Sequence, residues 1–132
     1  MTDELREIPL LAGVSDAGLD RIAMCAGELE AEPGQVLALP EDPGTGMFVI
    51  REGEVVVELR DLRVELGPGD FFGELALLVP DAARVGRVRA KTRVRALSLP
   101  RDDFLALLDS EPGLALAMLR ELARRLVATT AP

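Results

Sequence analysis

The stretch that decides the fold is GRVRAKTRVRALSLP, residues 86–100, in which small or apolar residues alternate with basic ones. Successive side chains of a β-strand point to opposite faces, so this alternation predicts a pair of half-buried strands. The buried side would carry Val88, Ala90, Thr92, Val94, Ala96 and Ser98, and the solvated side Arg87, Arg89, Lys91, Arg93 and Arg95. We expect these five cations to form an ordinary solvated face that pairs with the many carboxylates, not a surface that binds polyanions.

The segment upstream also has a residue pattern typical of strands. From about residue 28, short runs of Val, Leu, Ile and Phe are broken by Gly, Pro and Asp. Strands are expected in QVLALP (35–40), MFVIREG (47–53), EVVVEL (54–59) and RDLRVELG (60–67), with a hinge at Gly53. Many short strands with evenly spaced turns favour a small antiparallel barrel or jelly roll.

The two ends of the chain are predicted to be helical. Near the start, Pro9 interrupts a helical pattern, and Ser15 is placed to cap the next helix. We therefore predict an α+β, mainly β, fold: an antiparallel jelly-roll β-barrel flanked by N- and C-terminal helices. The 132 residues form one domain in this interpretation, with a helical start at about 4–28, a β-roll at about 29–99 and C-terminal helices at about 101–127.

The last predicted helix is amphipathic. One of its faces carries Leu116, Leu119, Leu122, Ala123 and Leu126. Such a stripe usually packs on its own domain, but at a chain terminus it also permits a lid or a homodimer helix. The sequence leaves these alternatives open.

Composition excludes several classes of function. The chain has no histidine, which removes Ser–His and Cys–His catalysis and the imidazole ligands of a cupin-type metal enzyme. Its net charge is −8, and it has neither Tyr nor Trp, so a broad basic face or a base-stacking platform for nucleic acid is not expected. These exclusions favour a binding protein over an enzyme, with no cofactor and no metal.

Cellular context is read from three further features. No apolar run is long enough to span a bilayer, and no signal peptide is visible at the start, so we expect a cytoplasmic protein that does not bind membranes. The single cysteine, Cys25, cannot form an internal disulfide and is expected to be a small buried apolar residue.

The candidate site lies in GDFFGELALLVPDAARVGRVRA, residues 69–90. One helical turn beginning at Gly73 would present unpaired backbone N–H groups, which favour an anion, and glycine allows a ligand to approach the backbone closely. Glu74 would repel a phosphate but can accept hydrogen bonds from sugar hydroxyls. Arg84 can clamp phosphate oxygens with two hydrogen bonds. Together these groups suit a sugar carrying one phosphodiester charge, although Glu74 and Arg84 could instead form a plain salt bridge.

At these residues the chain resembles the cyclic nucleotide-binding domain, the sensor module of bacterial catabolite activator proteins, cAMP-dependent kinases and cyclic-nucleotide-gated channels. IPLLAGVSDAGLDRIA is similar to that family's helical opening, and EPGQVLALPEDPGTGMFVIREGEVVV is similar to its first strands. LGPGDFFGELALL (66–78) followed by Arg84 resembles its phosphate-binding cassette, the most specific part. ALSLPRDDFLALL resembles the last strand and the helix after it.

The resemblance implies a role for each site residue. Gly73, Leu75 and Ala76 would offer backbone N–H groups or line the turn, Glu74 would bind the ribose 2′-hydroxyl, and Arg84 would bind the cyclic phosphate. Val64 and the Phe71–Phe72 pair would wall the pocket, without the sequence saying which of them touches ligand. The implied function is a non-catalytic regulatory sensor for cAMP, with cGMP as the other ligand, whose C-terminal helix moves on binding.

The chain departs from the family pattern directly after the arginine. The family usually reads Arg-Ser-Ala or Arg-Thr-Ala, whereas here Arg84 is followed by Val85 and Gly86. The missing hydroxyl removes one side-chain hydrogen bond, worth about 0.5–1.5 kcal/mol. In the family a threonine here helps hold guanine in its syn form, so Val85 argues against cGMP.

Two further matters stay open in the sequence. One is the alternative function, a domain of the same fold that has lost ligand binding and serves as an interaction or dimerisation module. The other is the effector: the last predicted helix ends near Val127, which is compatible with a fragment of a larger protein or with a stand-alone sensor.

Overall fold

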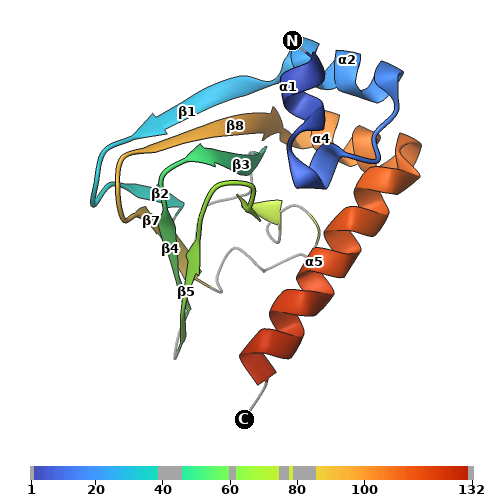
Figure 1. Cartoon of the computed structure of the whole chain (residues 1–132). Coiled ribbons are helices and arrows are strands. Elements are labelled where there is room, and N and C mark those ends of the chain that lie inside the picture. The colour runs from blue at the N-terminus through green and yellow to red at the C-terminus, as the bar shows by residue number, and fades with distance from the viewer. Residues whose placement is uncertain (1, 39–45, 60–61, 75–77, 79–85, 131–132) are drawn as a thin grey trace. The chain divides into compact units, whose positions relative to one another are not determined.

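The computed structural model describes residues 2–38, 46–59, 62–74, 78 and 86–130. The helical elements of these residues are α1 (Thr2–Arg6), the 3-10 helix η1 (Pro9–Leu11), α2 (Asp16–Cys25), α4 (Arg101–Ser110) and α5 (Pro112–Thr130) (Figure 1). The strands are β1 (Gly27–Ala31), β2 (Val36–Ala38), β3 (Gly46–Glu52), β4 (Val55–Leu59), β5 (Leu62–Leu66), β6 (Phe71–Phe72), β7 (Gly86–Ala90) and β8 (Val94–Pro100).

The strands form two four-stranded antiparallel sheets, in the orders β1-β8-β3-β6 and β2-β7-β4-β5. The first strand pairs with the last, β2 with β7, β3 with β6 and β4 with β5. This nested pairing is that of a jelly roll. The predicted fold class, a mainly β antiparallel roll between N- and C-terminal helices, is confirmed.

The chain divides into two compact units. One is the roll, Cys25–Phe104, and the other combines the helical segments Met1–Met24 and Leu105–Pro132. The helical start ends earlier than expected because Gly27 is already paired with Ser98 in β1, and α5 continues to Thr130. The interpretation of residues 1–132 as one domain stays a prediction.

The interior of the roll is apolar because alternate strand positions face it. Its buried cluster consists of Ala31, Ile50, Val55, Leu66, Phe72, Val88, Ala90, Val94 and Ala96. Leu29, Leu37, Phe48, Val57 and Val64 are partly buried and pack against that cluster. The alternation of residues 86–100 is thereby confirmed for Val88, Ala90, Val94 and Ala96, and burial of their apolar surface is the main stabilising term of the roll. Thr92 and Ser98, predicted on the same side, are only half-buried, and Leu99 on the opposite side is fully buried.

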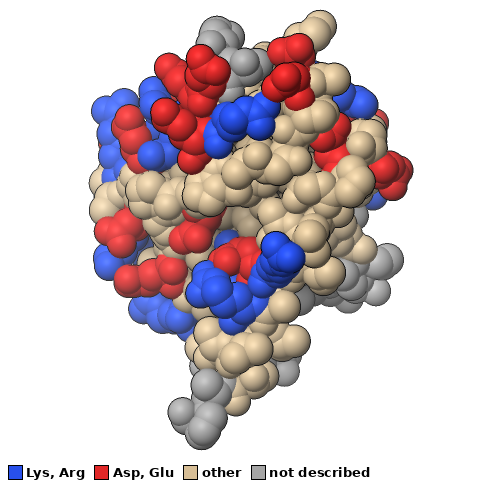
Figure 2. Space-filling view, turned by 45° about the vertical axis from the view of Figure 1, so that its right-hand side comes forward, with Lys and Arg blue, Asp and Glu red and all other residues tan. Residues whose placement is uncertain are grey.

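The basic face of β7 and β8 is paired with carboxylates across the strands. The ion pairs are Arg87–Glu58 (2.8 Å), Arg89–Glu58 (3.4 Å), Lys91–Glu65 (2.9 Å), Arg93–Glu30 (3.9 Å), Arg95–Glu28 (3.3 Å) and Arg95–Glu52 (3.3 Å). The hydrogen bond from Arg87 lowers the pKa of the Glu58 carboxyl, and the bond to Glu65 raises the pKa of Lys91. Acidic and basic side chains are interspersed on the face that Figure 2 presents. The expectation of an ordinary solvated face is confirmed.

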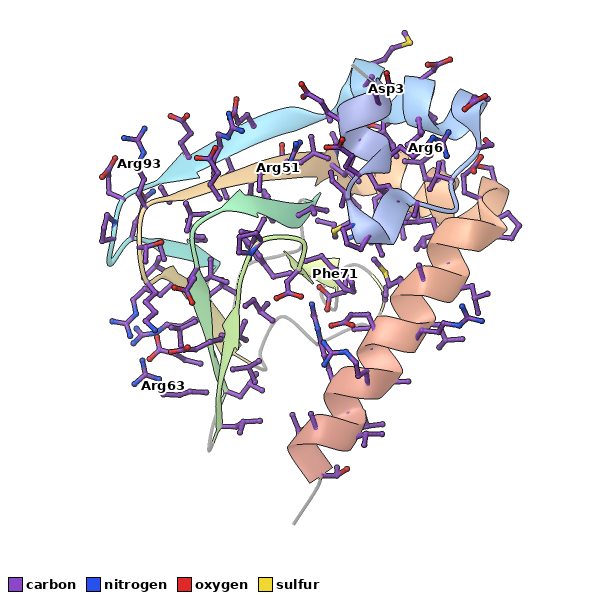
Figure 3. All side chains as sticks on the ribbon, viewed as in Figure 1. Asp3, Arg6, Arg51, Arg63, Phe71 and Arg93 are labelled. Atoms are coloured by element: carbon purple, nitrogen blue, oxygen red, sulfur yellow. The ribbon has the colours of Figure 1, made fainter. Side chains whose placement is uncertain are left out.

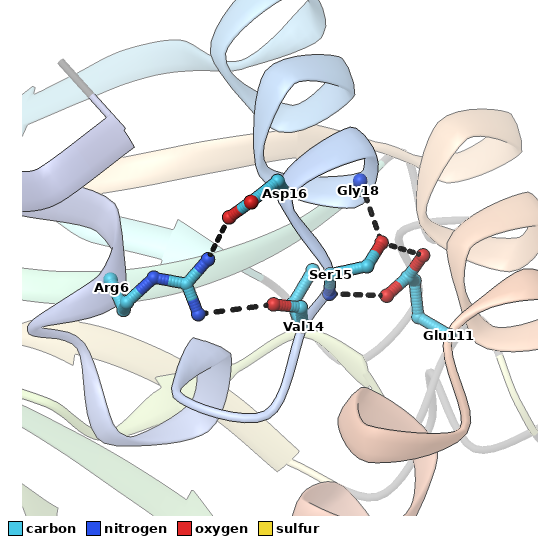
Figure 4. Close-up of polar contacts among 6 residues, drawn as sticks. All are labelled: Arg6, Val14, Ser15, Asp16, Gly18 and Glu111. Carbon is cyan, nitrogen blue, oxygen red and sulfur yellow. Dashed lines mark hydrogen bonds and ion pairs between the residues drawn. The ribbon is translucent and has the colours of Figure 1, made fainter.

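In the helical unit, Ser15 caps α2 as the sequence predicts. Its hydroxyl accepts a hydrogen bond from the backbone N–H of Gly18 at 3.1 Å and donates one to the Glu111 carboxylate at 2.8 Å (Figure 4). The other oxygen of that carboxylate accepts the backbone N–H of Ser15 at 2.8 Å. Glu111 precedes α5, so a single buried carboxylate links the start of α2 to the start of α5.

Two expectations about helices are decided by the structure. The sequence left open whether the leucine stripe of α5 packs on its own domain, and most of the stripe is exposed: Leu116, Leu119 and Leu126 are 46%, 63% and 64% exposed, while Leu122 is half-buried. The buried positions are Leu114 and Met118, one turn apart on another side of the helix. The second expectation, a buried Cys25, is wrong. Cys25 is partly exposed because it is the last residue of α2.

Candidate functional site

The candidate site begins with a turn that docks on β3. Within the turn, the side chain of Asp70 accepts the N–H of Gly67 at 2.9 Å, and the N–H of Asp70 donates to the carbonyl of Gly67 at 3.0 Å. The backbone of Ile50 then bonds to this turn twice: its N–H donates to Asp70 and its carbonyl accepts from Gly69, both at 2.8 Å. The chain therefore reaches the site along a fixed, antiparallel path.

The two phenylalanines of β6 face opposite sides of their sheet. Phe72 belongs to the interior cluster of the roll, where Val64 also packs, and it pairs with Phe48. Phe71 pairs with Val49, is 1% exposed and is labelled on β6 in Figure 3. Of the two aromatic residues considered as pocket walls, Phe72 is the one in the interior of the roll.

Gly73 follows β6 in a backbone conformation that only glycine adopts readily. Its φ is +92°. A Cβ at this position would lie 2.9 Å from the carbonyl oxygen of Gly46 and 3.4 Å from Cδ2 of Phe48. Close approach to β3 and the left-handed backbone therefore both require glycine here, in accordance with the glycine that the sequence analysis placed at the turn.

Glu74 is a buried carboxylate in helical conformation, with 3% of its surface exposed. Carboxylates are rarely buried, because their desolvation must be offset by hydrogen-bond donors or cations. A buried carboxylate directly after a tight glycine turn is chemically suited to accept hydrogen bonds from hydroxyl groups.

The structure thus brings Phe72, Gly73 and Glu74 together at the end of β6. The other predicted site residues, Leu75, Ala76, Arg84 and Val85, lie outside the described residues. Sequence reasoning missed Phe48, whose ring stacks on Phe72 with centroids 5.1 Å apart. Only the register of β3 against β6 could have revealed it. In the described part of the chain, no group of three or more Cys, Asp or Glu side chains is arranged to hold a metal ion.

A family model described as cyclic nucleotide-binding domain matches residues 28–111, which include this site. The chain belongs to that family. It is 35% identical over 115 residues, 85% of its length, to a cAMP-dependent protein kinase regulatory subunit of Colletotrichum orbiculare, and spans 29% of that protein. The expected family resemblance is confirmed.

Two solved structures illustrate the similarity of this domain. The catabolite activator protein of Thermus thermophilus is 28% identical with a TM-score of 0.73, over 92% of this chain and 59% of that one. A structure reported for a cyclic-GMP-dependent signalling pathway that regulates bacterial phytopathogenesis is 34% identical with a TM-score of 0.68, over 86% of this chain and 94% of that one.

The curated relatives are longer proteins. This chain spans 27% to 30% of the length of the potassium channels and kinase regulatory subunit that match it first. In the part of the chain that the structure describes, no helix is both long enough and apolar enough to cross a membrane.

Proposed function

We propose that this domain is a regulatory sensor that binds cAMP. The observation that carries the proposal is the family match across residues 28–111, because that range contains the whole Gly73–Glu74 turn and Arg84. The name of the fungal kinase regulatory subunit, cAMP-dependent, supports cAMP as the ligand.

Each proposed contact follows from the chemistry of the side chain. Arg84 binds the cyclic phosphate, the backbone N–H groups of Gly73, Leu75 and Ala76 line its oxygens, and Glu74 accepts hydrogen bonds from the ribose 2′-hydroxyl. Burial of Glu74 supports its part, because a carboxylate held away from water binds hydroxyl groups without competition from solvent.

Val64 and Phe72 form the apolar wall in this proposal. Both belong to the interior packing of the roll, which supports the assignment. Val85 supports cAMP over cGMP, since its side chain offers no hydroxyl to a guanine base. The similarity to a structure from a cyclic-GMP-dependent pathway makes cGMP the ligand to compare.

The remaining parts of the proposal concern signalling. We propose that the domain has no catalytic activity, that binding shifts the position of α5, and that the protein acts in the cytoplasm on an effector not identified by the sequence. A homodimer through the exposed leucines of α5 belongs to the same proposal. A ligand shifts such an equilibrium only by its differential affinity for the two states.

A second candidate function rests on the Val85–Gly86 departure. If losing the hydroxyl weakens binding beyond use, the domain serves as an interaction module of the same fold. One neutral hydrogen bond is worth about 0.5–1.5 kcal/mol, a factor of about 2 to 13 in affinity. That loss is too small to abolish binding by a site with an intact arginine, so the sensor is the preferred proposal.

Isothermal titration of the purified chain with cAMP and, separately, cGMP tests the proposal. We expect binding in the micromolar range or tighter, with cAMP preferred. Arg84→Ala should remove binding, since it deletes the cation proposed for the phosphate. Arg87→Ala is the matched control: it removes the same charge three residues later, from a side chain whose Nε donates to Glu58 at 2.8 Å. If the folded wild-type protein bound neither nucleotide, the result would favour the interaction module.

A further inference from the structure

We infer that Phe48 is a positioning residue for the nucleotide site: its ring holds Gly73, and with it Glu74, in place from the neighbouring strand. The inference rests on the proposed function, because nucleotide affinity is one of the two quantities that test it. The other readout, the conformation of Gly73 in the free protein, does not depend on any ligand.

The backbone of Phe48 is fixed from both sides. Strand β3 lies between β8 and β6, and Phe48 is paired with Ser98 on one side and with Phe72 on the other. Two residues earlier, Gly46 is paired with Pro100. The backbone that carries the ring of Phe48 is therefore held by strand pairing on both sides.

The ring lies beside the turn. It stacks on Phe72, the residue before Gly73, with an interplanar angle of 22° and a centroid separation of 5.1 Å. Its Cδ2 lies 3.4 Å from the position that a Cβ of Gly73 would take, and the carbonyl oxygen of Gly46 lies 2.9 Å from the same point. The ring and the backbone of β3 thus leave room beside Gly73 for a hydrogen atom but not for a side chain.

The conformation of Gly73 depends on its neighbours because glycine has no side chain to anchor it. Glycine is the residue with the widest choice of backbone conformations, and here it must keep φ at +92°. Removing the ring would leave space beside Gly73 and let the turn sample other conformations. Even a small displacement of a binding group from its productive position weakens ligand binding, so the effect would appear in the affinity for nucleotide.

The experiment compares the wild-type chain with Phe48→Leu and Phe48→Tyr. Leucine keeps an apolar side chain but removes the ring, and tyrosine restores the ring. Val94→Ala is the control for general loosening of the roll, since Val94 is fully buried in the same cluster but lies on β8 opposite Ala31 of β1. Melting temperatures confirm that each variant is folded.

Two quantities are measured: the three-bond HN–Hα couplings of Gly73 without nucleotide, which report its φ and do not depend on the magnetic shielding of a nearby ring, and the dissociation constant for cAMP. For Phe48→Leu we expect altered Gly73 couplings and affinity weaker by roughly two- to thirteenfold, the range that loss of an aromatic stack spans. Phe48→Tyr should return both quantities to wild-type values, and Val94→Ala should change neither beyond its effect on melting.

The outcomes separate this inference from the proposed function. Gly73 couplings unchanged in Phe48→Leu overturn the inference, and so does an equal change of those couplings in Val94→Ala. Weaker binding with an unmoved Gly73 would mean that the ring touches the ligand instead of placing the turn. A wild-type protein that binds neither cAMP nor cGMP overturns the proposed function, while the couplings of Gly73 still test the role of Phe48.

Discussion

Gly53 and Gly34 have almost the same φ, +89° and +87°, in different surroundings. A Cβ at Gly53 would lie 2.0 Å from the carbonyl oxygen of Arg93, whereas nothing lies within 4 Å of one at Gly34. We expect Gly34→Ala to reduce the free energy of unfolding by about 1–2 kcal/mol, from the left-handed backbone alone. Gly53→Ala should cost about 3 kcal/mol or more, because a steric clash is added.

Chemical denaturation of the two glycine variants measures this difference directly. The pair is matched because the substitution and the backbone angle are the same, so only the neighbouring carbonyl differs. Equal losses of stability would contradict the argument, since they would mean that the hinge between β3 and β4 yields to the added methyl group.

The Glu111 carboxylate gives the helical unit a pH-dependent link. Hydrogen bonds from the backbone and side chain of Ser15 hold its pKa below its ordinary value of 4.5. A carboxyl with a lowered pKa in the folded state stabilises the protein above its unfolded pKa, and that stabilisation is lost as the pH falls through the folded value. We therefore expect Glu111→Gln to be less stable than wild type at neutral pH, with a gap that narrows below about pH 4.5.

Urea midpoints of wild type and Glu111→Gln, measured from about pH 7 down to the acid limit of folding, follow that gap. Asp20→Asn, which removes an exposed carboxylate from α2, controls for the general effect of net charge. A gap that stays constant down to the acid limit would show that Glu111 contributes through packing and not through its charge.

Among the elements, the strands within residues 35–67 and 86–100 were predictable from sequence, whereas β1, β6 and the orientation of the last helix were not. Alternation along residues 86–100 predicts both strands and their buried sides, because a period of two leaves one choice of face once apolar residues occupy it. Helix α5 has apolar residues on two sides, Leu114 and Met118 on one and Leu116 and Leu119 on the other. Periodicity alone cannot tell which side a helix buries.

The candidate site shows the same division. Gly73 and Glu74 stand out in the sequence because LGPGDFFGELALL resembles the phosphate-binding cassette of the family; the glycine–carboxylate pair alone would equally suit a turn glycine and a salt bridge. The opposite facing of Phe71 and Phe72, and the part of Phe48, depend on the register of β6 against β3. Strand β6 has only two residues and so carries no pattern from which its register could be derived.

Two adjacent residues of α5 test which side of this helix is buried. Met118 is 2% exposed and Leu119 is 63% exposed. Met118→Ala should cost about 2–5 kcal/mol of unfolding free energy, because it leaves a cavity in a packed interior. Leu119→Ala should stay within about 0.5 kcal/mol, as for most surface substitutions. Thermal or chemical denaturation measures both. The reverse order would mean that the leucine stripe is the packed face.

For the whole molecule, the question is whether the roll and the helical unit respond together to ligand. The proposed contacts to cAMP all come from residues 64–85, within the roll, and the proposed signal leaves through α5. Hydrogen exchange followed by mass spectrometry reads both in one experiment. With cAMP at about 100 times its dissociation constant, global unfolding becomes less favourable by about 2.7 kcal/mol, which slows every amide that exchanges through global unfolding.

Amides that exchange by local opening separate a transmitted signal from this general protection. The last turn of α5, residues 126–130, is solvent-exposed and is expected to exchange by fraying, at a rate that global stability does not set. We expect cAMP to change exchange there as well as around Gly73 and Glu74, and AMP or the Arg84→Ala variant to change neither. Protection confined to residues 25–104 would mean that the roll binds nucleotide without altering α5. The domain would then be a binder whose output must leave by another surface, because an effector on α5 would sense no difference between the free and the bound state.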